Sequence, residues 1–225
     1  MDKIKNLLWV IIESCIRNIG GNIGSKIRYF YYKKRLKFCG VDVRFKENVH
    51  ITGLEYISID NNTTIDRNAI ISAGPVDISQ YHSLKRANKK FKLQEGELFI
   101  GKNIHIGPNT IIQAHAGLYF GDNGSMSASS KIFSLSNSPT DPADLSNVIY
   151  MTNKLKNSAY YSSPIHIEEN VGVGINSIVL PGVNVGKNSY IAPNSIVMTR
   201  VKENSFVNGN PAQKIKDRFK DYQKI

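Results

Sequence analysis

The stretch IEENVGVGINSIVLPGVNVGKNSYIAPNSIV, residues 167–197, has an aliphatic residue at every sixth position from its first residue to its last. An α-helix repeats about every 3.6 residues and a β-strand every 2, so neither element alone explains this period. A unit of six fits a short strand that points one aliphatic side chain inward, followed by a corner where the chain turns. The repeating positions are Ile167, Val173, Val179, Val185, Ile191 and Val197.

The same spacing occurs earlier in the chain, from about residue 41 onward. Ile59, Ile65 and Ile71 are six apart, and so are Ile100, Ile106 and Ile112; Phe120, Met126 and Ile132 resume the period after two extra residues. Asparagine often stands three positions after the aliphatic residue. It tolerates the left-handed backbone region better than other residues with a side chain, so we expect it at corners. These asparagines are Asn62, Asn68, Asn103, Asn109, Asn123, Asn170, Asn176, Asn188 and Asn194.

Three such units, each a short flat strand (called here a flat) and its corner, would make a triangular coil of 18 residues. Stacked coils would form parallel sheets whose neighbouring strands are about 4.8 Å apart. Each coil buries its aliphatic side chains only against neighbouring coils, so several coils and capped ends are needed. The sequence therefore predicts a mainly β protein, with a parallel β-helix over residues 41–210.

The two ends of the chain read as helical. Residues 3–19 carry apolar side chains at i, i+3, i+4 and i+7, which predicts an amphipathic helix that ends at Gly20 and Gly21. Residues 25–38 predict a second, basic and aromatic helix. Residues 211–225 predict a short closing helix with Pro211 at its start. The region 1–40 would either pack on the β-helix or dock on the inner face of a membrane.

The charge is concentrated at the start of the chain. The 225 residues have a net charge of +11, and residues 1–40 hold nine Lys and Arg against Asp2 and Glu13. The sequence shows no zinc pattern, base-stacking module or recognition helix, so we expect no nucleic-acid partner. An anionic membrane or a polyanionic substrate fits this charge better. Two cysteines, a six-residue apolar run and no cleavage site favour a cytoplasmic protein without a signal peptide or a membrane span.

Two polar stretches break the period, at residues 73–98 and 138–164. Long loops in a compact domain are usually functional or disordered, and loops that leave a solenoid can form the wall of a cleft. Plain surface decoration is the alternative interpretation, and it weighs more for the first loop than for the second.

The C-terminal half, including the ending VNGNPA at 207–212, resembles the hexapeptide-repeat acyltransferases. The resemblance implies a left-handed parallel β-helix, transfer of an acetyl group from acetyl-CoA, and a homotrimer with active sites between subunits. Within the family, the chain is most similar to the sugar and polysaccharide O-acetyltransferases. That similarity implies an acceptor hydroxyl on a surface polysaccharide or a lipid-linked precursor.

Transfer to a hydroxyl requires a general base, for which histidine is well suited at neutral pH. His115 lies in IIQAHAGLYFGDN, at the corner where two extra residues delay the repeat, and this motif resembles the base-carrying stretch of serine and polysaccharide acetyltransferases. We therefore expect His115 to be the base, oriented by Asp122 or by a backbone carbonyl. In maltose-type relatives the base ends a stretch like IFSLSN, where this chain has Asn137.

Further site residues follow from the resemblance and from residue chemistry. For the coenzyme we expect backbone contacts at Gly172, Gly174 and Ser177, and phosphate contacts from the basic residues Arg200, Lys214 and Lys216. For the acceptor we expect Asn137, His105, His82 from the first loop, and Tyr160, which would either stack on a sugar ring or pin its loop. No set of histidines matches the corners of a β-helical metal site, so no metal is expected.

Two other functions fit the same sequence. One is N-acetylation of an amino sugar nucleotide, for which residues 1–40 are too short to supply a separate nucleotide-binding domain. The other is a catalytically silent β-helix that serves as a scaffold, an interpretation that Asn137 in place of a base would support.

Overall fold

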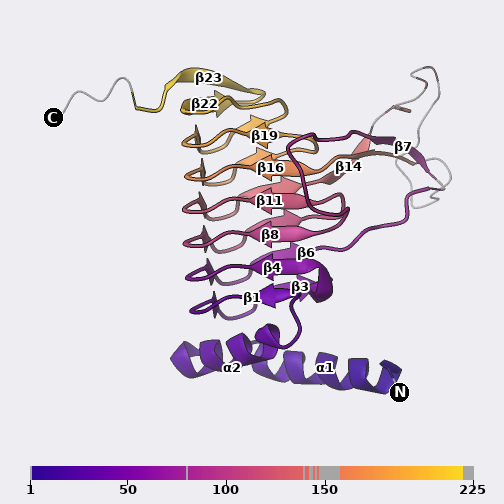
Figure 1. The fold of residues 1–225 in the computed structure, drawn as a ribbon, viewed down its shortest axis with the longest axis vertical. Coiled ribbons are helices and arrows are strands. Elements are labelled where there is room, and N and C mark those ends of the chain that lie inside the picture. The colour runs from indigo at the N-terminus through magenta and orange to yellow at the C-terminus, as the bar shows by residue number, and fades with distance from the viewer. Residues whose placement is uncertain are drawn as a thin grey trace.

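The computed structural model describes residues 2–79, 81–138, 140–141, 144, 146 and 158–219. Two helices, α1 (Asp2–Ile16) and α2 (Gly21–Lys33), lie across one end of a stack of three-sided coils (Figure 1). The helices precede the coils, as predicted, but α2 begins and ends earlier than the expected 25–38. Phe38 and Cys39 already form the first strand of the coils, so the repeats begin slightly before residue 41.

Each flat of the coils contributes one strand to one of three sheets. The first sheet contains β1 (Phe38–Cys39), β4 (Ile57–Ile59), β8 (Leu98–Ile100), β11 (Leu118–Phe120), β16 (Ile165–Ile167) and β19 (Asn184–Val185). The second contains β2 (Arg44–Phe45), β5 (Thr64–Ile65), β9 (His105–Ile106), β12 (Ser125–Met126), β17 (Gly172–Val173), β20 (Tyr190–Ile191), β22 (Ser205–Gly209) and β23 (Ala212–Asp217). The third contains β3 (His50–Thr52), β6 (Ile70–Ser72), β10 (Ile111–Gln113), β13 (Lys131–Phe133), β18 (Ile178–Val179) and β21 (Ile196–Val197).

The residues with the six-residue spacing form the core, as predicted. The strands pair in parallel so that the same repeat position stacks from coil to coil, for example Ile59 on Ile100 and Ile167 on Val185. All fifteen aliphatic, Phe and Met positions identified from the spacing are at most 1% exposed. Because every inward side chain rests on the coils above and below it, the coils are stable only as a stack.

The corners confirm the interpretation of the asparagines. All nine asparagines identified from the sequence have a positive φ, between 54° and 60°. Their side chains also bond along the stack: Asn62 Nδ2 donates to Asn103 Oδ1 at 2.8 Å, and Asn103 Nδ2 donates to Asn123 Oδ1 at 2.8 Å. Each of these nine corners therefore combines a left-handed backbone with a ladder of side-chain amides.

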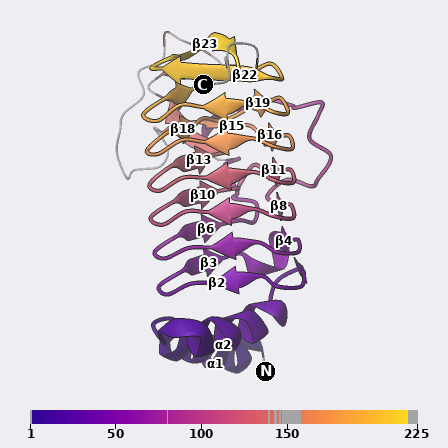
Figure 2. The ribbon, with the colours of Figure 1, turned by 90° about the vertical axis from the view of Figure 1, so that its left-hand side faces the viewer.

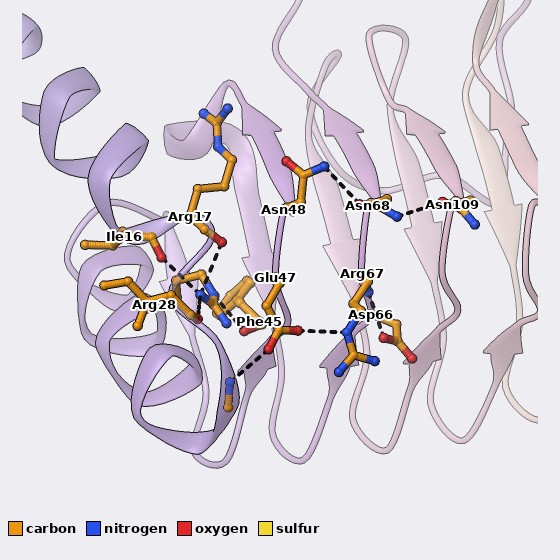
Figure 3. A network of polar contacts seen from close by, with 12 residues as sticks. Ile16, Arg17, Arg28, Phe45, Glu47, Asn48, Asp66, Arg67, Asn68 and Asn109 are labelled. Atoms are coloured by element: carbon orange, nitrogen blue, oxygen red, sulfur yellow. Dashed lines mark hydrogen bonds and ion pairs between the residues drawn. The ribbon is translucent and has the colours of Figure 1, made fainter.

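A buried arginine fastens the helices to the first coil (Figure 3). The guanidinium of Arg28 is fully buried; its Nε donates to the carbonyl of Phe45 at 3.0 Å, and its Nη1 donates to those of Ile16 at 3.0 Å and Ile19 at 2.7 Å. One side chain thus caps the C-terminus of α1 and ties α2 to β2. The open end of the core is covered in this way, as a solenoid requires.

The closing helix predicted for residues 211–225 is wrong for the described part of that range. Ala212–Asp217 form strand β23, which runs antiparallel to β22 with Val207 opposite Lys214. The last coil would otherwise leave the backbone donors and acceptors of β22 unpaired at the edge of the sheet, and the returning strand satisfies them. Residues 220–225 lie outside the described residues.

The corner geometry predicts a graded response at Asn103. Asn103→Ala loses two ladder bonds and places an ordinary side chain at positive φ, which costs about 1–2 kcal/mol for the backbone and about 1 kcal/mol for the bonds. Asn103→Gly loses the same bonds but keeps the backbone unstrained, so it should cost roughly 1 kcal/mol. Urea denaturation of both variants measures the difference; equal losses would show that the left-handed backbone does not make the corner.

Candidate active site

Both long loops leave the β-helix from the same edge. This edge, called here the excursion edge, consists of the corners that follow third-sheet strands: the first loop leaves after β6 and the second after β13. The two loops join in a small side sheet of β14 (Leu135–Ser138), β15 (Ala159–Ser162) and β7 (His82–Lys85), which projects from the β-helix (Figure 1). The loops therefore build one wall against one edge.

A groove runs between this wall and the excursion edge. Its first part has a volume of about 370 Å³ and is lined by Leu84, Arg86, Ser136, Asn137, Tyr161, Ser163, Leu180, Pro181 and Met198. Its second part, also about 370 Å³, shares Arg86, Ser163, Pro181 and Met198 and adds Lys89, Lys90 and Arg200. A third part of about 270 Å³ continues past Lys90 and Arg200 to Lys202. We call these three parts together the excursion groove.

The first loop is held firmly where it forms the groove wall. The hydroxyl of Ser163 donates to the carbonyl of Arg86 at 2.8 Å, and the side-chain amide of Asn88 donates to Asn184 Oδ1 at 2.7 Å. The first loop thus forms the wall of a cleft, which is one of the two interpretations given above for residues 73–98. Its run KRANKK (85–90) faces the corners that follow the third-sheet strands.

The groove is apolar and aromatic at one end and cationic at the other. Arg86, Lys89, Lys90, Arg200 and Lys202 line its second and third parts, against the carboxylates of Glu168 and Glu203. Lys90 forms an ion pair with Glu168. Burial alone would raise the pKa of Glu168, but hydrogen bonds from Lys90 and the Lys187 amide outweigh it and lower the pKa, so this carboxylate stays charged at neutral pH. The remaining excess of cations suits a ligand with several phosphates.

His115 lies on the same edge, one coil before the side sheet. It is half-buried at the corner between β10 and β11, and its Nδ1 lies 2.8 Å from the carbonyl oxygen of Gly74. A carbonyl oxygen only accepts hydrogen bonds, so Nδ1 carries the proton and Nε2 of the neutral ring keeps its lone pair. This is the tautomer that a general base needs. The ring points toward the coil below, and His115 is not among the residues that line the groove.

Asp122 does not orient His115. It lies at the next corner of the coil, beyond β11, where Oδ1 accepts from the amide of Lys102 at 3.1 Å and Oδ2 lies 3.6 Å from Lys102 Nζ. Of the two alternatives predicted from the sequence, the backbone carbonyl is the one observed. His115 lies at the corner before β11 and Asp122 lies at the corner after it. The two side chains are therefore at different edges of the coil.

The backbone N–H groups expected to bind the coenzyme are already used within the β-helix. Gly172 N–H donates to Ser189 at 3.1 Å, Gly174 N–H to Ile191 at 2.8 Å, and Ser177 N–H to Gly174 at 3.3 Å. A Cβ on Gly174 would lie 2.6 Å from backbone atoms of the next coil. The glycine is thus required by close stacking, and none of the three N–H groups is left for a ligand.

The three predicted phosphate-binding residues are separated. Arg200 is exposed and lines the groove. Lys214 and Lys216 lie on β23 at the end of the stack, where Lys214 pairs with Asp217 and Lys216 lies over the ring of Phe206 at 5.8 Å. The helix predicted to carry both lysines does not form. Lys214 lines a hollow of about 420 Å³ with Lys202 and Glu203, which also line the third part of the groove, whereas Lys216 is not among the lining residues.

The four predicted acceptor residues are also divided. Asn137 lies in the groove, and its strand neighbour across the side sheet is Tyr160. Because side chains alternate along a strand, Tyr161 lines the groove while Tyr160 packs on Tyr81 with 5.4 Å between ring centroids. His105 is exposed on the second sheet beside Asp66, away from the groove. His82 lies on β7, but its side chain lies outside the described part of the chain.

Sequence reasoning missed the cations contributed by the first loop. Arg86, Lys89 and Lys90 come from a basic run that reads as ordinary loop surface until the side sheet turns it toward Arg200. Among the described residues, no group of three or more His, Cys, Asp and Glu side chains is placed to hold a metal ion.

Comparisons of sequence connect the chain with acetyltransferases. It is 34% identical over 128 residues to a galactoside O-acetyltransferase of Lactococcus lactis, a match covering 55% of this chain and 59% of that protein. It is 40% identical over 76 residues to the galactoside O-acetyltransferase of Escherichia coli, covering 30% and 37%. The chain thus spans less than two thirds of these relatives. No family model matches it.

Comparisons of structure agree over most of the chain. A variant of AntD, an N-acyltransferase from Bacillus cereus in complex with dTDP-4-amino-4,6-dideoxyglucose and coenzyme A, gives a TM-score of 0.68 at 20% identity, covering 86% of this chain and 90% of that one. A hexapeptide-repeat acetyltransferase from Vibrio cholerae complexed with acetyl-CoA gives 0.57 at 18% identity, covering 95% and 86%. By sequence the chain is similar to acetyltransferases, and its fold is the left-handed parallel β-helix of the hexapeptide-repeat acetyltransferase structures.

Proposed function

We propose that the protein is a cytoplasmic acetyltransferase that moves an acetyl group from acetyl-CoA to a hydroxyl of a sugar. The observation that carries the proposal is the excursion groove, which joins a strongly cationic end at Lys90 and Arg200 to a mostly uncharged end at Asn137 and Tyr161, where Arg86 is the single charged residue among those described as lining it. Coenzyme A has the matching division, with phosphates at one end and a thioester at the other. The galactoside O-acetyltransferases to which the chain is similar support a sugar acceptor.

The groove fits the coenzyme in one direction. Its phosphates would lie against Arg86, Lys89, Lys90 and Arg200. These side chains can donate charge-assisted hydrogen bonds to phosphate, which are stronger than hydrogen bonds between neutral groups. The uncharged pantetheine arm would pass over Pro181 and Met198, and the thioester would reach Ser136 and Asn137. The side-chain amide of Asn137 is a donor suited to the oxyanion that forms during transfer.

The chemistry is a direct transfer with His115 as general base. The acceptor oxygen forms a bond to the thioester carbonyl carbon, the carbon–sulfur bond breaks, and the hydroxyl proton passes to Nε2 of His115. That proton then goes to the departing thiolate, which restores the neutral imidazole. The carbonyl of Gly74, which holds the proton on Nδ1, keeps the ring in the required tautomer throughout.

The site needs a further wall, because His115 lies one coil away from the groove that holds the thioester. We place that wall on a neighbouring subunit of a homotrimer, so that the acceptor enters between two copies. The acceptor we favour is a sugar of a surface polysaccharide or of its lipid-linked precursor, with Tyr161 available to stack on the ring. Tyr161 is half-buried, Asn137 is exposed, and both line the first part of the groove.

A second candidate is N-acylation of an amino sugar nucleotide. A neutral amine attacks a thioester without a strong base, and the described residues that line the groove include no histidine. The structures of AntD, an N-acyltransferase, share this fold. The third reading, a silent scaffold, requires that the groove bind no coenzyme.

The base is tested by His115→Ala. O-transfer should fall by about 10²–10⁴, the usual contribution of a general base, with an unchanged melting temperature. His105→Ala, which removes an exposed histidine outside the groove, is the matched control and should retain full activity. Mass spectrometry of a sugar panel incubated with acetyl-CoA gives the rates. A His115→Ala enzyme with the normal rate would remove His115 from the mechanism and favour amine acceptors.

The coenzyme site is tested by Arg200→Ala. Loss of one charge-assisted contact to phosphate should raise the KM for acetyl-CoA about tenfold and leave kcat unchanged, because the reacting atoms are at the other end of the groove. Arg44→Ala is the control, since Arg44 is exposed on the second sheet and pairs with Asp42. An unchanged KM in Arg200→Ala would place the phosphates elsewhere.

The oligomer is tested by light scattering coupled to size-exclusion chromatography. The proposal expects a mass three times that of the chain, at concentrations where the enzyme is active. A monomer that retains full activity would contradict a site completed by a neighbouring copy.

A further inference from the structure

The apolar stripe of α1 faces solvent. The side of α1 turned toward the β-helix carries Trp9, Glu13 and Ile16, with Glu13 buried and bonded to the hydroxyls of Tyr31 and Tyr32. The helix therefore packs through an unusual mixed surface. Its strongly apolar side is left exposed, with Leu7 60%, Leu8 54%, Ile11 51% and Ile12 42% exposed.

The second helix repeats this arrangement. Gly24, Arg28, Tyr31 and Tyr32 are buried against α1 and the first coil. A second stripe at helical spacing is exposed on α2, with Ile23 73%, Ile27 38% and Phe30 62% exposed. Of the two sequence interpretations of residues 1–40, packing on the β-helix accounts for the polar and aromatic face, and it leaves both apolar stripes without a partner among the described residues.

Both stripes belong to one end of the molecule. Figures 1 and 2 show the two helices lying flat across the base of the stack, perpendicular to its long axis. The bonds from Arg28 to three carbonyls around the end of α1, and from the Tyr31 hydroxyl to the Trp9 carbonyl at 3.1 Å, hold the helices together as one plate. We call this plate, α1 with α2, the end plate.

The end plate is also strongly cationic. Residues 1–40 carry nine Lys and Arg against two acidic residues, a net charge of +7, and one of the two acids is the buried Glu13. On α2 and just beyond it, the exposed residues Lys26, Lys33 and Lys34 lie beside the Ile23, Ile27 and Phe30 stripe. Apolar side chains bordered by lysines are the pattern of a helix that lies in the interface of an anionic membrane.

We propose that the end plate docks on an anionic lipid surface, with α1 and α2 parallel to the membrane and the β-helix standing away from it. Within the described part of the chain, no helix is long and apolar enough to cross a bilayer, so the helices would lie on the membrane surface. The apolar side chains enter the boundary of the acyl chains, and the lysines contact lipid phosphates.

A second copy of the chain fits the end plate less well than a membrane does. Two plates placed face to face would bring the exposed Lys26, Lys33 and Lys34 of both copies together with few acids to pair them. An anionic lipid surface instead supplies the opposite charge and an apolar layer at the same depth. This proposal does not depend on the acetyl transfer proposed above.

The test is flotation of the full chain with lipid vesicles. Vesicles of phosphatidylcholine with about one third phosphatidylglycerol should carry the protein upward, and pure phosphatidylcholine should carry about tenfold less, since each lysine near the surface adds attraction. Leu8→Ser with Ile11→Ser should lower binding about tenfold, and so should Lys26→Glu with Lys34→Glu. Leu8, Ile11, Lys26 and Lys34 are all exposed, so the circular dichroism of both variants should be unchanged.

Ile175→Ser is the matched control, because Ile175 is 54% exposed at a corner of the β-helix. It should float like the unaltered chain, and raised salt should weaken binding of both. The proposal is overturned if the unaltered chain does not float with anionic vesicles, or if the control variant loses as much binding as the stripe variant. An oligomer that forms without lipid and dissociates when the stripe is altered would assign the plate to a second copy instead.

Discussion

The structure depends on one backbone constraint: every sixth residue or so, the chain must turn a corner in the left-handed region. Among the described residues, asparagine meets this constraint at eleven corners, and its side chain bonds to the asparagine of a neighbouring coil. The regular corners keep fifteen aliphatic, Phe and Met side chains in register along the axis. They also produce three straight edges, and a loop inserted at any one of them projects sideways without disturbing the stack.

This regularity is why the fold could be predicted from the sequence. The position of each inward residue is local information, because a corner and a three-residue flat need no distant partner to be recognised. The prediction was wrong at Ala212–Asp217. The composition of this segment fits a helix, but it forms a strand because it pairs with the backbone of β22, which would otherwise be exposed. The predicted bounds of the second helix, 25–38, were imprecise. Helix α2 begins at Gly21, so its exposed stripe from Ile23 to Phe30 starts before the predicted range.

The candidate site was predictable only in part, because it depends on loops that break the repeat. Asn137 and Arg200 do meet in one groove, and His115 has its proton fixed on Nδ1. The cations of Arg86, Lys89 and Lys90 were not foreseen, since pairing of β7 with β15 joins segments about 77 residues apart. Gly174 shows the opposite error: its small size serves the stacking of coils, which outweighs any need to approach a ligand.

The central claim is that the excursion groove holds coenzyme A, and backbone hydrogen exchange tests it most directly. On addition of coenzyme A, the account predicts slower exchange in the first loop at 84–90 and at the corners within 180–202, with no change at 172–177. Protection of 172–177 in place of the loop, or no protection anywhere, would contradict the account.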